Sequence, residues 1–366
     1  MNQEENNQMD HLILPKKTLA RFADEKQSVH ILNLNDMSNI RVDKKRARSF
    51  HTECNYYLPK YDEKVKKIET EFGNVYTKIS TSIRNGCKPN IDPIELKRNI
   101  IEFLTIEFHR SVVVDDDLRE KYMGQQLMRN EQQELQLIQN GLLDFSSAEY
   151  YKTFRTVYKD REMAKKYTQN ILGIPNEAII STYSDCFCAH VLYIQDGKDY
   201  SFLLPPMHFV GNESFAIFVL APNVALGLYP QFENIPFFWC IPKGRVEAIN
   251  LRILESVTLL GHGFREVVGR RADLDILCDK IKNIISVSKF ESDNIVIDKQ
   301  FKLCNEYDFA LLCLVLYIQT KESGDKHKNV TIAKSCIESN NFQSSLGDFI
   351  QYFKKYNMHL QIVDES

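Results

Sequence analysis

Apolar and polar residues alternate with two different periods along the chain, and each period predicts one kind of element. Positions 29–34 alternate apolar with polar residues, which predicts a short half-buried strand, and a second strand is expected over 40–42. From Asp62 the apolar residues recur every three or four positions, which is the period of an amphipathic helix. Two consecutive helices are therefore predicted, over Asp62–Arg84 and Asp92–Arg110.

These two helices carry apolar stripes that are too wide to remain in water, so we expect them to pack against each other. The residues expected at the contact between these two helices are Ile68, Phe72, Ile79, Ile100 and Leu104.

Two more helices are expected after them. The carboxylates at 115–117 indicate the start of one. A capping-box spacing at Ser146–Glu149 predicts the other, which runs to about residue 170.

The segment 178–241 has a different character, because runs of β-branched and aromatic residues are separated by five prolines. That pattern is typical of a meandering sheet. The later elements are expected, in chain order, as a helix over 246–260, a strand over 264–268, a helix over 274–285 and, beyond a seam at 285–297, helices around 310–318 and 346–356.

Together these patterns predict an α+β protein with a helix-rich N-terminal half, a central mixed or antiparallel sheet and an appended helical C-terminal unit. The chain has 366 residues, which is enough for one large domain or two ordinary ones. We expect a polar tail over residues 1–10, a main α+β domain over 11–285 and an accessory unit over 286–366. A protein partner, if the chain has one, is expected to bind the C-terminal unit.

Composition and charge limit where such a protein works and what it binds. The chain is 43% hydrophobic and 26% charged, which is ordinary for a folded protein. The first ten residues lack the basic and apolar regions of a signal peptide, and the clean apolar run 309–318 is too short to cross a bilayer. We therefore expect a soluble, cytoplasmic protein with no membrane partner.

A net charge of −3 gives nucleic acid no general attraction, so any binding of phosphate must come from a local patch. One such patch is the basic segment 41–48, which contains Arg41, Lys44, Lys45, Arg46 and Arg48. Two interpretations stay open for it. A solvated loop is favoured, and a phosphate-binding patch is the alternative.

Nine cysteines are spread along the chain and none forms a C-x-x-C pair, so the strongest zinc and redox signatures are missing. Cys186, Cys188 and His190 are spaced two apart, which would place all three on one face of a strand. Thiolate and imidazole groups suit zinc or copper, but common structural zinc sites use wider cysteine spacing. We favour a packed strand face without a metal.

A series of short motifs follows one another from about residue 10 to residue 285. They are His11 before Pro15, Leu19 and Phe22; Glu53 before Tyr56 and Tyr57; Glu69 early in a helix; Arg110 at the end of the next; Ser184-Asp185; an apolar strand ending at Leu220-Ala-Pro222; and Asn250. In this order they resemble domain-of-unknown-function family four-two-three-eight. One extra residue separates His11 from Pro15, and Cys186-Phe187 stands where the family has Asn-Pro.

The resemblance implies a helical N-terminal half with a small sheet, and it nominates His11, Glu53, Glu69, Arg110 and Asp185 as one constellation. It implies no activity, because the family is uncharacterised. The residue types are those of a phosphodiester-cleaving site: a general acid or base, carboxylates for a divalent ion such as magnesium or manganese, and an arginine for developing negative charge.

The leading hypothesis is therefore a nucleic-acid-directed hydrolase. A toxin-like or antiviral-defence role is suggested only by the bacterial, accessory character of the family. The alternative is a non-catalytic binding or scaffold protein, in which the same five residues form a structural polar network. Whether the chain is an enzyme stays open at this point.

Overall fold

The computed structural model describes the chain apart from residues 115–186 and several shorter stretches. The described residues are 10–12, 16–50, 52–54, 59–114, 187–195, 198–206, 209–212, 215–231, 234–258, 265–291, 294–323, 329–337, 350, 353–354 and 356–364. Their helices and sheets confirm the α+β class that the sequence predicts. The helices expected from 115–117 and over 146–170 lie outside the described residues.

The N-terminal part begins with short strands and one short helix. These are β1 (Asp10–Leu12), α1 (Lys16–Phe22), β2 (Ser28–Asn33), β3 (Arg41–Arg46) and β4 (Thr52–Cys54). β2 pairs antiparallel with β3 on one side and with β10 (Glu266–Gly269), from much later in the chain, on the other. The strands predicted near 29–34, 40–42 and 264–268 are thus confirmed. β1 and β4 form a separate antiparallel ribbon.

Two long helices follow, α2 (Pro59–Arg84) and α3 (Pro93–Val114). Each begins with proline at its first position, where the missing N–H is not needed. Gly86 has a φ of 64° and ends α2 in the left-handed conformation that glycine adopts without strain. The carboxylate of Asp92 accepts the N–H of Ile94 at 3.0 Å and so caps α3. Both predicted helices are confirmed.

A five-stranded sheet forms the centre of the molecule. Its strands are β5 (Phe187–Tyr193), β6 (Phe209–Asn212), β7 (Phe215–Ala221), β8 (Val224–Pro230) and β9 (Phe238–Cys240). Their spatial order is β6-β7-β8-β5-β9, and only β5 and β9 run parallel. The sheet is therefore mixed and mostly antiparallel, and it lies in the region that the sequence assigns to β structure.

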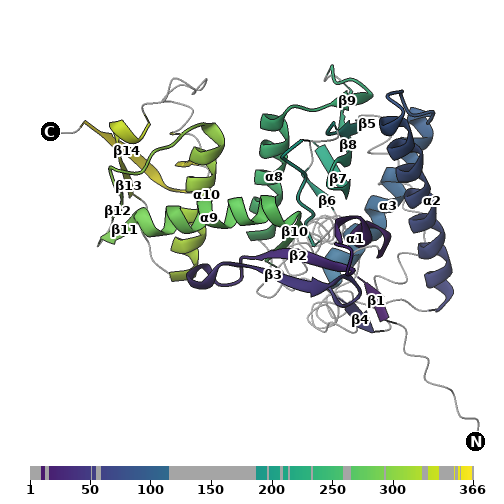
Figure 1. The fold of residues 1–366 in the computed structure, drawn as a ribbon, viewed down its shortest axis with the longest axis horizontal. Coiled ribbons are helices and arrows are strands. Elements are labelled where there is room, and N and C mark those ends of the chain that lie inside the picture. The colour runs from purple at the N-terminus through teal and green to yellow at the C-terminus, as the bar shows by residue number, and fades with distance from the viewer. Residues whose placement is uncertain are drawn as a thin grey trace, which may run out of the picture.

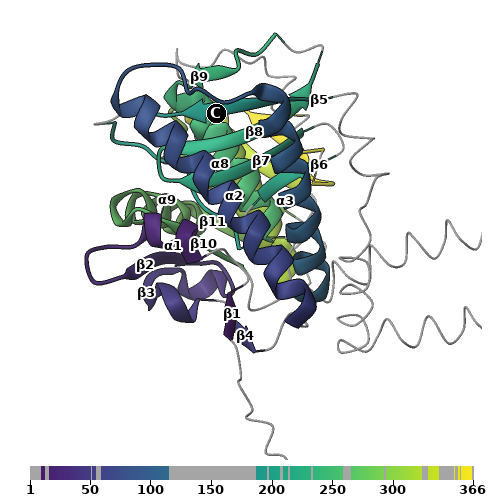
Figure 2. The same cartoon turned by 90° about the vertical axis from the view of Figure 1, so that its right-hand side faces the viewer.

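The α2–α3 hairpin covers one face of this sheet (Figures 1 and 2). Phe72 and Phe103 stack with their ring centroids 4.0 Å apart, and both rings meet Phe218 of β7 edge-on at 6.1 Å. The predicted contact between the helices is confirmed. Of its expected members, Phe72, Ile79 and Ile100 are buried, Ile68 is half-buried, and the side chain of Leu104 lies outside the described part.

The opposite face of the sheet belongs to a larger core that continues through the rest of the molecule. α8 (Lys243–Thr258) lies on this side, and α9 (Arg271–Val287) runs from the three-stranded sheet toward the C-terminal strands (Figure 1). These are the helices predicted over 246–260 and 274–285. Alternate residues of β7 face the two cores, which is why its sequence reads as a continuous apolar run.

The C-terminal part contains a sheet that the sequence pattern does not show. Its strands are β11 (Ser288–Glu291), β12 (Asn294–Ile297), β13 (Asn329–Ala333) and β14 (His359–Val363), and α10 (Glu306–Ser323) connects β12 to its parallel neighbour β13. The expectation of a helical unit needs correction, because strands of four or five residues are too short to show a clear period. The helix predicted around 310–318 is confirmed as α10, whereas the one around 346–356 lies mostly outside the described residues.

Almost the whole circumference of α10 is apolar and buried, since it packs between the C-terminal sheet and the helices α8 and α9. The core therefore has no break between residues before and after 285. Among the helices that the structure describes, α10 included, none combines the length and the apolar character needed to cross a membrane.

Candidate functional site

Two of the five residues nominated by the family resemblance face each other across a strand ladder. β1 and β4 pair antiparallel, and His11 is the Cα partner of Glu53 in that register. Directly opposite positions in an antiparallel pair share a face of the sheet, at the closest spacing that neighbouring strands offer. The fold thus brings together a histidine and a glutamate position that are far apart in the sequence.

Glu69 and Arg110 lie toward one end of the α2–α3 hairpin. Glu69 precedes Phe72 by three residues and Arg110 follows Phe103 by seven, so both positions lie on the same side of the stacked rings. At 1.5 Å per residue they lie about 4.5 and about 10.5 Å from the stack along the helix axes. The two positions are therefore separated axially by about one helical turn. Glu69 is half-buried beside the apolar stripe of α2.

The β1–β4 ribbon lies beside that end of the hairpin in both views (Figures 1 and 2). β4 also leads into α2 within a few residues. Four of the nominated positions, His11, Glu53, Glu69 and Arg110, therefore lie on neighbouring elements. At three of them, all but Glu69, the structure describes the backbone alone. The fifth residue, Asp185, lies outside the described residues, so its membership stays a prediction.

The residue types on these elements suit cleavage of a phosphodiester. An imidazole moves a proton near neutral pH, a carboxylate activates water or holds a cation, and a guanidinium stabilises negative charge on phosphate oxygens. Magnesium and manganese prefer such oxygen ligands. In the described part of the chain, no three histidine, cysteine, aspartate or glutamate side chains form a group that could hold a metal. The divalent-ion site therefore stays a prediction.

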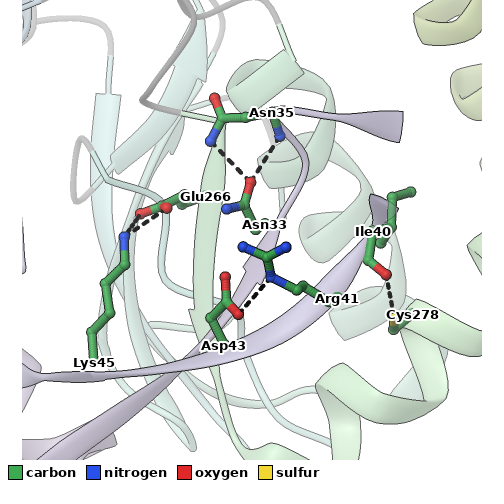
Figure 3. Close-up of polar contacts among 8 residues, drawn as sticks. All are labelled: Asn33, Asn35, Ile40, Arg41, Asp43, Lys45, Glu266 and Cys278. Carbon is green, nitrogen blue, oxygen red and sulfur yellow. Dashed lines mark hydrogen bonds and ion pairs between the residues drawn. The ribbon is translucent and has the colours of Figure 1, made fainter. Parts of the chain in front are cut away.

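A second polar cluster lies on the three-stranded sheet (Figure 3). Glu266 is only 3% exposed, and Lys45 donates to its two carboxylate oxygens at 2.8 and 3.0 Å. Along β3, Arg41 Nε donates to Asp43 Oδ1 at 2.8 Å. The expectation of a solvated loop over 41–48 is therefore wrong, because most of this segment is a strand that pairs with β2.

A further ion pair ties β3 to the turn before β2. Lys44 Nζ lies 2.6 Å from Asp24 Oδ2, and Asp24 Oδ1 accepts the N–H groups of Lys26 and Ser28. The hydrogen bond from Lys44 and those from the backbone lower the pKa of Asp24 to about 2. This carboxylate therefore stays ionised over the whole range of pH in which the protein would be studied.

Replacing Lys45 by methionine is expected to lower the free energy of unfolding by about 1–2 kcal/mol. The substitution keeps the aliphatic stem but removes the ammonium group from the buried carboxylate of Glu266. Because Lys45 itself is half-exposed, we expect a loss of stability at the low end of the range seen when a buried charged group loses its partner. Urea unfolding measures the change. Lys26→Met on the exposed turn is the control, and an equal loss in both variants would show that the buried pair has no special role.

The strand β5 carries two of the three residues singled out as metal-ligand types. His190 is buried, its Nδ1 lies 3.1 Å from the carbonyl oxygen of Pro236, and its ring meets Tyr229 edge-on at 5.7 Å. Cys188 is half-buried two positions earlier, and Cys186 lies outside the described residues. The contacts of His190 support the predicted packed strand face.

Elemental analysis of the purified chain is expected to find neither zinc nor copper in stoichiometric amount. The reason is that the His190 ring already packs against protein atoms on a strand within the core. One metal per chain that disappears in Cys188→Ser would contradict this expectation. Cys304→Ser, which changes an exposed cysteine far from β5, is the matched control.

Asn250, another residue of the resemblance, has a structural role. Its side chain accepts the N–H of Leu203 at 2.9 Å and donates to the carbonyl of Ser201 at 2.8 Å. These bonds hold the segment before β6 against α8. The hydroxyl of Ser201 donates to Asp273, which Arg270 also binds through two nitrogens. The network satisfies polar groups at the edge of the core and needs no catalytic role to explain it.

One polar cluster could not be found by sequence reasoning, because its residues come from three helices. Lys280 of α9 donates to Asp308 of α10 at 2.6 Å, and its Nζ lies 5.3 Å from the centre of the Tyr307 ring. Burial raises the pKa of Glu247 on α8 and that of Tyr307. The cluster connects α8 and α9 to the C-terminal part of the chain, and no periodic pattern in the sequence marks it.

Comparisons of the chain with models of protein families, with curated proteins and with solved structures found no match. The resemblance to family four-two-three-eight is neither supported nor opposed by them and stays a prediction.

Proposed function

We propose that the chain is a nucleic-acid-directed hydrolase that cleaves phosphodiester bonds at the β1–β4 ribbon, beside the α2–α3 hairpin. The observation that carries this proposal is the register of the ribbon, in which His11 lies directly opposite Glu53. A strand ladder holds such a pair at a fixed spacing, and a rigid element is a better support for a catalytic pair than a loop. Glu69 and Arg110 lie on the neighbouring helices.

Each residue has a distinct role in this proposal. His11 acts as the general acid or base, and Glu53 either orients the imidazole or activates the attacking water. Arg110 stabilises the negative charge that develops on the phosphoryl oxygens. The carboxylates of Glu69 and Asp185 would hold magnesium or manganese, and the ion, when bound, would supply a Lewis acid for the same charge.

Cleavage assays on the full-length chain test the proposal. The protein is incubated with single-stranded and structured RNA and DNA in magnesium, in manganese and in EDTA. The proposal expects cleavage of at least one substrate class with either metal and none in EDTA. Intact substrates throughout such a panel, from a preparation shown to be folded, would contradict it. A toxin-like or defence role requires this activity first and would then appear as growth arrest on expression.

The alternative function is a non-catalytic scaffold, and one observation favours it. Arg21 of α1 packs its guanidinium 3.5 Å from the centre of the Tyr76 ring and donates to the carbonyl of Leu220 at 3.1 Å. Burial lowers the pKa of Arg21 to about 10, so this cation is still charged at neutral pH. Polar contacts thus fasten the N-terminal segment to α2 and β7, and His11 belongs to the same segment.

A further inference from the structure

The segment 41–48 concentrates positive charge in a chain whose net charge is −3. It holds five basic residues and one acidic residue. Charged side chains on an outer strand help to prevent pairing with other molecules, and this accounts for part of the pattern. It does not account for Arg48, which lies beyond the strand in a short turn over Ala47–Ser49. The run of basic residues therefore continues past the end of β3.

β3 is the outer strand of its sheet, and no strand of the described part pairs with its other edge. Lys45 is turned toward the buried Glu266, and the other four basic residues are exposed: Arg41, Lys44, Arg46 and Arg48. Exposure does not mean that they lack partners, since Arg41 lies 2.8 Å from Asp43 and Lys44 lies 2.6 Å from Asp24. With a rise of about 3.3 Å per residue, the strand from Arg41 to Arg46 is about 17 Å long. Side chains from both faces of an outer strand can reach a ligand that lies along its edge.

This row of cations leads to the candidate site. After Arg48 the chain passes the buried Phe50 and enters β4, where Glu53 lies opposite His11. β3 and the β1–β4 ribbon are neighbours in both views (Figures 1 and 2). The chain from Arg48 to Glu53 spans less than about 20 Å even when fully extended. A polyanion lying on β3 would therefore have its next phosphates close to the ribbon.

We propose that the exposed edge of β3 binds the sugar–phosphate backbone of a nucleic acid strand and guides it to the β1–β4 ribbon. This inference rests on the proposed function, for which it supplies the substrate-binding surface. Three of the four exposed cations are arginines, whose planar guanidinium groups bind phosphate through two parallel hydrogen bonds. Contacts of this kind read no bases, so binding should be independent of sequence and should weaken as salt rises.

The test measures binding without cleavage. The full-length chain in EDTA is titrated into a short fluorescent oligothymidine, and anisotropy is recorded at several salt concentrations. We expect the logarithm of the affinity to fall linearly with the logarithm of the salt concentration. In the double variant Arg46→Ala/Arg48→Ala the slope should decrease in magnitude by about 1.4, or about 0.7 for each phosphate that the protein no longer neutralises. Lysine at both positions should keep most of the slope.

The control removes two exposed cations elsewhere, Arg98→Ala and Lys334→Ala, and should leave the slope unchanged. No binding to the oligonucleotide, or equal loss in both double variants, would overturn the inference even if cleavage is observed. Binding with the expected slope but no cleavage in magnesium or manganese would sustain it while removing the proposed function. Phosphatidylserine vesicles form a second arm: if they bind the chain and the oligonucleotide does not, the basic edge serves a membrane surface and the inference fails.

Discussion

Replacing Phe72 by alanine is expected to lower the free energy of unfolding by about 3–5 kcal/mol. The ring is 4% exposed, stacks on Phe103 at 4.0 Å and meets Phe218 of the central sheet. Its removal leaves a cavity where three elements converge, and neither a helix nor a sheet can collapse easily to fill it. Denaturant unfolding followed by circular dichroism measures the change.

Ile94→Ala is the matched control for this variant, because Ile94 lies on α3 but is 77% exposed. It should change the free energy of unfolding by no more than about 0.5 kcal/mol. Phe103→Ala should resemble Phe72→Ala, and the double variant should be destabilised by less than the sum of the two, because both substitutions remove the same pair of stacked rings. If Phe72→Ala is as mild as the control, the hairpin does not pack on the sheet as described.

Substitutions at the candidate site should have a different effect. If the chain is a hydrolase, His11→Ala should reduce cleavage by about 10²–10⁴-fold, the usual contribution of a general acid or base. Glu69→Gln should also reduce cleavage, because it removes a carboxylate that is proposed to hold the divalent ion. Neither should change the free energy of unfolding by more than about 1 kcal/mol, because His11 lies on a short terminal ribbon and Glu69 is only half-buried. Initial rates on the best substrate of the panel, recorded over a range of metal concentrations, are the measurement.

Glu63→Gln provides the control, since it removes one carboxylate from an exposed position in the first turns of α2. It should leave both cleavage and stability unchanged. A structural network predicts the opposite pattern for the site residues, with loss of stability in His11→Ala and Glu69→Gln and no cleavage by the unaltered chain. That outcome would establish the scaffold alternative.

The elements that the sequence predicts well are those whose pattern is long and local. α2 and α3 each repeat an apolar residue every three or four positions over more than twenty residues, and the faces they bury follow from that period. The C-terminal strands repeat nothing over their four or five residues. β12, β13 and β14 pair in parallel, and α10 connects β12 to β13, so this pairing is a property of the fold and not of any one segment.

The candidate site, too, was predictable only in part. The types of its residues are visible in the sequence, but the pairing of His11 with Glu53 depends on the register between two three-residue strands. Local patterns cannot fix such a register. The basic segment shows a further limit, because its charge suggests a loop while its hydrogen bonds to β2 make it a strand. The intrinsic preference of residues for strand or loop predicts their conformation poorly where they can pair with a neighbouring strand.

The pairing of β2 with β10 has a consequence for how the chain is made. Arg265, just before β10, bonds to Asn35, which lies 230 residues earlier. A ribosome that adds about 5–20 residues per second reaches β10 roughly 10–50 s after β2 has been synthesised. During that time one edge of β2, including the apolar Ile31 and Leu32, has no permanent partner strand. This edge must therefore be kept from aggregating while the chain is being synthesised, and we expect chaperones to act in that interval.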